Sequence, residues 1–220
     1  FKHYAFRTRA VATHTTPAGP YRGVAAPIAF MAFEGMMDRA AAALGLTREE
    51  IRRRNLLGTA DFPFVNASGI RYDVANHHET LAKALVLSDW DGFALRRDVD
   101  PDRLRGIGIA CVTEQTGQGS TRYRARGLLR IPGIEAARLK MEPSGRATLA
   151  VSQTTQGQGH LTTFAQMAAE HLGIPPAHIT VLEGDTAVSP FGSGTFASRS
   201  VVSAGGAVIT AAEVIAKKIK

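Results

Sequence analysis

The stretch Thr155-Gln156-Gly157-Gln158-Gly159-His160 decides how this 220-residue chain is interpreted. It is a polar glycine turn that opens into a helical pattern running from His160 to Leu172. Glycine lets a ligand approach the main chain closely, and glutamine amides suit a polar heterocycle as well as a phosphate. The first turn of a helix also offers unpaired N–H groups that attract anions. A lone turn of this kind is more often structural, so the stretch by itself leaves both interpretations open.

A second turn of the same kind shifts the balance toward a ligand. Gly194-Thr195-Phe196-Ala197-Ser198-Arg199-Ser200 precedes a long helix expected from Ser200 to about Lys218. Its hydroxyls and the guanidinium of Arg199 add donors at a second helix N-terminus, although Ser200 can serve simply as an N-cap. Arg22, just before a helix expected from Pro27, is a third candidate. If these turns converge, they form a cradle for a large phosphorylated cofactor.

Other chemistry-bearing residues point to no catalytic centre. Asp185 is either a turn former or a residue that orients a neighbour, and we favour the turn former. His77 and His78 adjoin on an expected helix, without metal-ligand spacing, and are interpreted as a solvated pair. The single cysteine, Cys111, rules out an internal disulfide and is interpreted as a small buried hydrophobe. No acid–base pair of carboxylates stands out.

The formal charge of +7 leaves a second function class open. A basic module that binds nucleic acid or another polyanion would suit this charge. The basic residues are scattered, however, and form no stripe interleaved with aromatic residues of the kind that single-strand binding needs. No apolar run reaches the ~18 residues that a membrane span requires, so we expect no membrane span.

The order of patterned segments predicts an α+β fold rather than regular α/β alternation. Helices are expected at Pro27–Leu44, mostly buried, at Arg48–Asn55 with Thr47 and Glu50 as a capping box, and at Asn76–Leu87. Strands are expected at Lys2–Thr15, at Gly106–Thr113, in a hairpin of Ile134–Met141 with Arg146–Gln153, and at His178–Leu182. The rest is expected to be irregular: Leu57–Tyr72, a charged linker up to Arg105, the loop Gln115–Arg126 and the loop Glu183–Gly194.

These segments, in this order, resemble the molybdenum-binding subunit of the xanthine dehydrogenase, aldehyde oxidase and carbon monoxide dehydrogenase family of molybdenum hydroxylases. The motifs of a first lobe are Tyr21-Arg22-Gly23-Val24 and the segment from Leu44 to Leu56. Those of a second lobe are Gly106-Ile107-Gly108-Ile109-Ala110, Gln156–His160, Gly184-Asp185-Thr186, Gly194-Thr195, Ser198-Arg199-Ser200 and Gly205-Gly206-Ala207. Each motif is weak alone, but their joint order over nearly the whole chain is specific.

The resemblance implies mixed sheets with packed helices, divided among three parts. Residues 1–57 would end a first molybdopterin-binding lobe, residues 58–105 would connect, and residues 106–220 would begin a second lobe. It also implies molybdopterin, in most bacterial members as the cytosine dinucleotide, with molybdenum held by the cofactor's sulfurs and by no protein ligand. The implied cofactor-binding residues are Arg22, Gly23, Val24, Gln156, Gly157, Gln158, Gly159, His160, Thr195, Phe196, Ala197, Ser198, Arg199 and Ser200.

The implied enzyme is a cytoplasmic bacterial oxidoreductase that hydroxylates aldehydes or aromatic heterocycles, or oxidises carbon monoxide, with oxygen derived from water. Electrons would pass to an iron–sulfur subunit and then to an FAD subunit. The family's catalytic glutamate has no match here and is expected beyond Lys220. We therefore expect a middle portion of a longer or naturally divided subunit, inactive alone, whose substrate the sequence does not reveal. A third hypothesis is an assembly fragment that keeps the family's sequence but has lost the cofactor.

Overall fold

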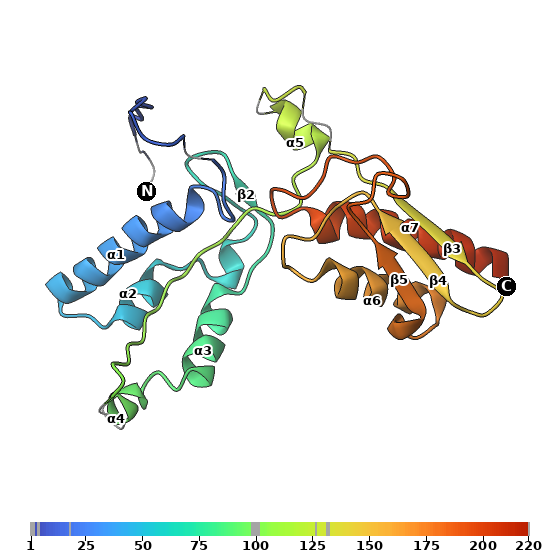
Figure 1. Ribbon diagram of the computed structural model, residues 1–220. Coiled ribbons are helices and arrows are strands. Elements are labelled where there is room, and N and C mark those ends of the chain that lie inside the picture. Colours follow the sequence, from blue (N-terminus) through green and yellow to red (C-terminus); the bar gives the residue numbers. More distant parts are fainter. Residues whose placement is uncertain are drawn as a thin grey trace. The chain divides into compact units, whose positions relative to one another are not determined.

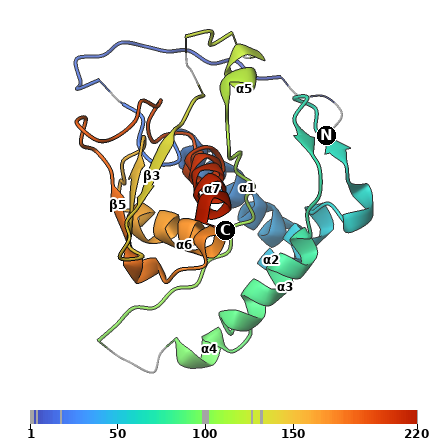
Figure 2. The same cartoon turned by 90° about the vertical axis from the view of Figure 1, so that its right-hand side faces the viewer.

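The chain forms two compact units, Phe1–Thr113 and Glu114–Lys220. The computed structural model describes residues 3, 5–17, 19–97, 102–125, 127–130 and 133–219. Figures 1 and 2 show the helices and strands of each unit in two views.

Unit 1 is helical, with one very small sheet. Helix α1 (Ala26–Leu44) carries Pro27 near its start and ends at Gly45, whose left-handed conformation suits glycine. Helix α2 (Arg48–Asn55) follows at once and packs against α1. The remaining elements are a 3₁₀ turn (Thr59–Asp61), the antiparallel pair β1 (Phe64–Val65) and β2 (Arg71–Tyr72), α3 (His77–Leu87) and α4 (Phe93–Arg96).

Local capping explains where two of these helices begin. The N-cap Thr47 accepts a hydrogen bond from the backbone N–H of Glu50, and Asn76 accepts one from that of Glu79. Each bond satisfies one of the amide donors that a helix start leaves unpaired. Both helix starts agree with the sequence prediction.

Unit 2 is a three-stranded sheet with two long helices. Strands β3 (Ala137–Met141) and β4 (Ala147–Val151) form the predicted antiparallel hairpin, closed at Gly145. Helix α6 (His160–Leu172) then crosses over to β5 (Ile179–Leu182), which pairs in parallel with β4. Helix α7 (Ser200–Ile219) contacts α6 and β3. Helix α5 (Ser120–Ala125) precedes the sheet.

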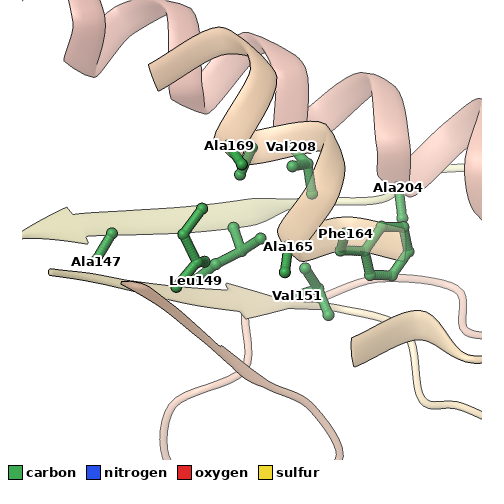
Figure 3. Close-up of a cluster of buried hydrophobic side chains, with 10 residues drawn as sticks. Ala147, Leu149, Val151, Phe164, Ala165, Ala169, Ala204 and Val208 are labelled. Atoms are coloured by element: carbon green, nitrogen blue, oxygen red, sulfur yellow. The ribbon is translucent and has the colours of Figure 1, made fainter. Parts of the chain in front are cut away.

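The core of unit 2 lies between the sheet and the helix pair. Side chains of β4, α6 and α7 meet there, as Figure 3 shows, among them Leu149, Val151, Phe164 and Val208, all without exposed surface. The two helices approach closely because Gly205 has no side chain. A Cβ there would lie 2.5 Å from Cε of Met167. This core fixes the ends of β4, α6 and α7, where the two glycine turns are attached.

Helix α7 also has the length and composition of a membrane span. Its buried residues Ala204, Gly205, Val208 and Ala212 nevertheless lie at the core of unit 2, where the helix contacts α6 and β3. One face of the helix is therefore packed, while only 22% of its span-like window is buried, and length and composition alone are weak evidence for a membrane span.

Several sequence predictions of local structure are wrong. The segment Leu57–Tyr72, expected to be irregular, contains a 3₁₀ turn and the β1–β2 pair, and the expected linker up to Arg105 contains α4. Helix α1 is not mostly buried, since only Ala41 is buried and Ile28, Met31 and Phe33 are at least 69% exposed. The apolar residues of α1 lie on more than one face of the helix, and the packing of α2 against α1 leaves most of them exposed. The described residues of 3–15 contain no strand, and residues 2 and 4 lie outside the described part.

Two further errors concern residues 106–125. Gly106–Thr113 is not a strand, because a strand needs a neighbour with which to exchange hydrogen bonds and no described segment pairs with it. The expected loop Gln115–Arg126 contains α5 up to Ala125, and Arg126 is not described. Tyr123, which is buried, anchors this short helix by its contact with Phe196.

Candidate functional site

The two glycine turns lie side by side in unit 2 and are hydrogen-bonded to each other. The side-chain nitrogen of Gln156 donates to the carbonyl of Thr195 at 3.3 Å. The hydroxyl of Thr195 donates to the carbonyl of Thr154 at 2.6 Å. The convergence predicted from the sequence is therefore confirmed for these two turns.

The first turn is shaped by its own side chains. Gln158 Oε1 accepts from the backbone N–H of Gln156 at 2.5 Å, and Gly157 N–H donates to the hydroxyl of Thr155 at 3.3 Å. Gly157 and Gly159 both have positive φ, at 97° and 79°. Only glycine adopts such a conformation readily, so the two glycines set the path of the chain into α6.

The start of α6 presents main-chain donors. Gly159 is the N-cap and makes no side-chain cap bond. Residues 154–159 are exposed, so this polar turn is open to a ligand. His160 departs from what we expected of a contact residue, because its ring is only 2% exposed. The ring stacks near Phe164, and its Nδ1 lies 3.6 Å from Oε2 of Glu183.

The second turn has an unusual backbone. Ala197 and Ser198 both lie in the left-handed region, with φ of 53° and 49°. Such values are uncommon for residues other than glycine, and they persist only where the surroundings hold them. One such contact is the hydrogen bond from the N–H of Gly117 to the carbonyl of Ser198, at 3.0 Å.

Arg199 is placed beneath this turn instead of at its surface. Its side chain is fully buried, pairs with Glu135 at 2.8 Å, and lies with its guanidinium carbon 4.8 Å from the centre of the Phe196 ring. The predicted contact between Arg199 and a ligand remains a prediction. What the structure gives is an arginine that supports the turn from within.

The third predicted turn lies in unit 1. Gly23 and Val24 have φ of 82° and 52°, and the N–H of Val24 donates to the carbonyl of Tyr21 at 2.6 Å. A Cβ on Gly23 would lie 2.7 Å from Cγ of Pro27, so glycine is needed where this turn enters α1. Arg22 is exposed. Its predicted approach to the cofactor remains a prediction.

Asp185 is a turn former, as favoured from the sequence. Its carboxylate accepts from the N–H of Ala187 at 2.8 Å, and its carbonyl accepts from the N–H groups of Val188 and Ser189. These bonds shape the loop between β5 and the second turn.

Sequence reasoning missed several residues around the two turns. Glu135, Ser152, Gly192 and Tyr123 form their support, and Gln153 is fully buried at the end of β4 with no hydrogen bond to its amide from any described residue. The one available signal was Glu135, an acidic residue next to the alternating apolar pattern of β3. The others act through contacts between segments far apart in the chain.

The donor set fits an anionic cofactor with a polar ring. The turns that lead into α6 and α7 are hydrogen-bonded to each other and carry exposed amide side chains and hydroxyl groups. Buried polar atoms such as both ring nitrogens of His160 have no hydrogen-bond partner within the described residues. No described group of three His, Cys, Asp or Glu side chains could hold a metal ion. The hydrogen-bonding groups at the two turns are of the kind that a large polar organic ligand requires.

Comparison with known proteins identifies the cofactor class. Two family models, both described as molybdopterin cofactor-binding domain, match residues 1–56 and residues 83–220. The chain belongs to this family, in the branch that comprises the molybdenum-binding large subunits of xanthine dehydrogenase and carbon monoxide dehydrogenase. The matches favour cofactor binding over the alternative of a polyanion-binding module.

Individual relatives agree with the family models. The carbon monoxide dehydrogenase large chain of Hydrogenophaga pseudoflava is 36% identical over 192 residues, covering 85% of this chain and 24% of the relative. The nicotine 6-hydroxylase large subunit of Paenarthrobacter nicotinovorans is 34% identical over 209 residues, covering 94% of this chain and 25% of the relative. The crystal structure of quinoline 2-oxidoreductase from Pseudomonas putida 86 superposes with a TM-score of 0.75 at 33% identity. The match covers 92% of this chain and 26% of the quinoline 2-oxidoreductase chain. The chain thus spans about a quarter of the length of these relatives.

Proposed function

We propose that this chain holds the molybdopterin of a molybdenum hydroxylase, in its cytosine dinucleotide form, at the paired turns of unit 2. The observation that carries the proposal is the direct hydrogen bonding between these turns, through Gln156 and Thr195. It joins the turns that lead into α6 and α7, which would form one polar surface. A pyrophosphate linking a pterin to a nucleotide needs such a surface, because its charge is spread over several oxygens.

Each turn has its own part in binding. The main chain of Gln156, Gly157, Gln158, Gly159 and His160 would hold the pterin and the pyrophosphate. The turn from Thr195 through Phe196, Ala197, Ser198 and Arg199 to Ser200 would cover the dithiolene and phosphate side, and Arg22, Gly23 and Val24 would approach the metal. Molybdenum would be held by the cofactor's sulfurs. When bound, the cofactor supplies the two-electron redox chemistry, and the chain binds and orients it.

The contacts described above refine these roles. Gln158 closes the first turn with its side chain, and Arg199 supports the second from below. Both would act on the cofactor by fixing main-chain N–H groups. Gln156 and Ser198, whose residues are exposed, are better placed for direct contact.

The wider function follows the relatives. The complete protein would hydroxylate an aldehyde, an aromatic heterocycle or a similar small substrate with oxygen derived from water, and would pass electrons to an iron–sulfur subunit and an FAD subunit. It would do so in the bacterial cytoplasm, without a membrane span and without nucleic acid. Within it, residues 1–57 and 106–220 would belong to two cofactor-binding lobes joined by residues 58–105.

The test is the cofactor content of the complete subunit, purified with its partner subunits. We expect molybdenum and one CMP, released on acid treatment, in equal amounts per subunit. Exchanging Gln156→Ala, which removes the amide that reaches Thr195, should lower both together. A well-folded wild-type preparation that contains neither molybdenum nor nucleotide would contradict the proposal and favour a fragment that has lost its cofactor.

A further inference from the structure

A fully buried ion pair lies under the second turn of unit 2. Nη1 of Arg199 is 2.8 Å from Oε1 of Glu135, and neither side chain has exposed surface. The contact is close but poorly aligned, since Oε1 accepts no hydrogen bond of good geometry from any described residue. Burying two charges costs free energy that their attraction offsets only when the remaining polar atoms are also satisfied. In an ion pair that serves stability alone, we would expect the remaining polar atoms of both side chains to be hydrogen-bonded.

The other oxygen of Glu135 is fixed by the β3–β4 hairpin. The hydroxyl of Ser152 donates to Oε2 at 2.5 Å and accepts from the N–H of Ala136 at 2.9 Å. The N–H of Ser152 donates to the carbonyl of Ala136 at 3.1 Å. The carboxylate is therefore oriented by a rigid part of the sheet.

The loop that leads into the second turn lies directly on this carboxylate. A Cβ on Gly192 would be 2.4 Å from the Cβ and the hydroxyl of Ser152 and 2.5 Å from Oε2 of Glu135. Next to it, the N–H of Ser193 donates to the carbonyl of Ile134 at 3.0 Å. The loop is thus held against Glu135 at a distance that only glycine allows.

The guanidinium of Arg199 lies on the inner side of the turn. Nη1 donates to the carbonyl of Gly194 at 3.5 Å, and the ring of Phe196 lies over the guanidinium. Nη2 and Nε have no hydrogen-bond partner in the described part of the chain. Between Gly194 and Arg199 come Ala197 and Ser198, the two residues in the left-handed conformation.

We propose that Glu135 is a positioning residue of the cofactor site: by orienting Arg199, it holds the turn 194–199 in the conformation that presents its N–H groups to the cofactor. The inference rests on the proposed cofactor-binding function. Glu135 lies outside both turns and acts on the cofactor only through Arg199. Removing the charge of Glu135 should therefore make the second turn more mobile while leaving the sheet unchanged.

The experiment uses the complete subunit with its partners and compares the wild type with Glu135→Gln, which removes the charge and keeps the shape. The cofactor affinity of the variant, measured by CMP retained per folded subunit during dialysis, should fall by about tenfold to a hundredfold, the usual effect of a supporting residue. Hydrogen exchange of the cofactor-free subunit should rise at residues 194–200 and stay unchanged at residues 147–151. Glu135→Asp, which restores the charge, should recover part of both losses.

Either of two results would overturn the inference. Glu135→Gln could retain CMP as the wild type does, or its exchange could rise as much at residues 147–151 as at residues 194–200, which is the mark of general destabilisation. Should Glu135→Gln fail to fold, Ser152→Ala replaces it. That variant removes one bond to the carboxylate, and unchanged exchange at 194–200 would then reject the role.

A matched control lies in unit 1, where Glu34→Gln removes one carboxylate from the buried Arg52. It should leave both the CMP content and the exchange of residues 194–200 unchanged. The exchange measurement needs no cofactor, so it decides the role of Glu135 even if the wild-type subunit contains no CMP. A subunit without CMP would count against the proposed function alone.

Discussion

Each unit of this chain contains a fully buried arginine, and the two are built differently. Arg52, in unit 1, donates from Nε to Glu34 at 2.7 Å and from Nη1 to Asp38 at 2.9 Å. It also donates to the carbonyls of Arg48 and Glu34. Arg199, in unit 2, has one carboxylate partner and leaves Nε and Nη2 without a hydrogen bond among the described residues.

The electrostatics of Arg52 fit a structural role. Burial, the largest single influence, lowers the pKa of its guanidinium, but the hydrogen bonds and charges of Glu34 and Asp38 together raise that pKa above its ordinary value. Such an arginine fastens α1 to α2 and has no donor to spare. Buried polar groups are normally hydrogen-bonded, and exceptions are expected at functional sites. The unpaired donors of Arg199, beneath a turn in the left-handed conformation, fit such a site.

The largest effect is expected from Arg52→Met, which sharpens this contrast. It leaves the partly buried Glu34 without its cation and Asp38 with Arg48 alone, so the free energy of unfolding should fall by about 3 kcal/mol. The CMP content per folded subunit should not change. Urea denaturation and nucleotide analysis of the complete subunit check both results. A loss of CMP at unchanged stability would contradict the structural role of Arg52.

A smaller effect on stability, with a larger one on the cofactor, is expected from Gly192→Ala. The added methyl group would collide with Ser152 and Glu135, costing about 1–3 kcal/mol and displacing the loop. CMP retention should fall as it does in Glu135→Gln. The control is Gly206→Ala in α7, where a Cβ would meet nothing within 4 Å. That change should leave CMP retention at the wild-type level.

The link between the two turns can be weakened without altering their shape. Thr195→Val removes the hydroxyl that donates to Thr154, which should cost about 1 kcal/mol, or about fivefold in cofactor affinity. Equilibrium dialysis of the complete subunit measures this. If neither Thr195→Val nor Gln156→Ala lowers the cofactor affinity, the two turns do not act as one surface.

The smallest expected effect is on the reactivity of the Cys111 thiol in unit 1. Burial, with a lesser contribution from the charge of Glu34, raises the pKa of the Cys111 thiol, while Arg52 acts in the opposite direction. The folded chain therefore holds the thiol proton more tightly than the unfolded chain. This preference for the protonated thiol contributes to the free energy of unfolding at pH values below the ordinary thiol pKa. The contribution is lost as the pH rises through the raised pKa of the folded chain. Alkylation by iodoacetamide should be slower in the folded than in the unfolded chain at neutral pH. Equal rates in the two states would contradict this.

Local patterns predicted local structure well. The β3–β4 hairpin follows from alternation around Gly145, and α6 begins and ends where the sequence places it, between Gly159 and Gly173. Thr47 and Asn76 cap their helices for reasons contained within four residues of chain. The family's motifs likewise lie in short turns, which is why the cofactor class could be inferred.

Contacts between distant segments could not be predicted in the same way. The apolar residues of α1 indicate a tendency to be buried but not which element would cover them. Gly106–Thr113 has the composition of a strand, but no described segment pairs with it. Arg199 was expected to contact the cofactor, and its local sequence does not show that its side chain is buried. Its partner Glu135 stands 64 positions earlier, and nothing in either local pattern connects the two.

The central claim, that the two turns of unit 2 form one cofactor surface, is tested most directly by hydrogen exchange of the complete subunit with and without its cofactor. The account predicts that the cofactor slows exchange at residues 156–163 and at residues 194–203 together, and to a comparable degree. Protection of one segment while the other exchanges at the cofactor-free rate would contradict it.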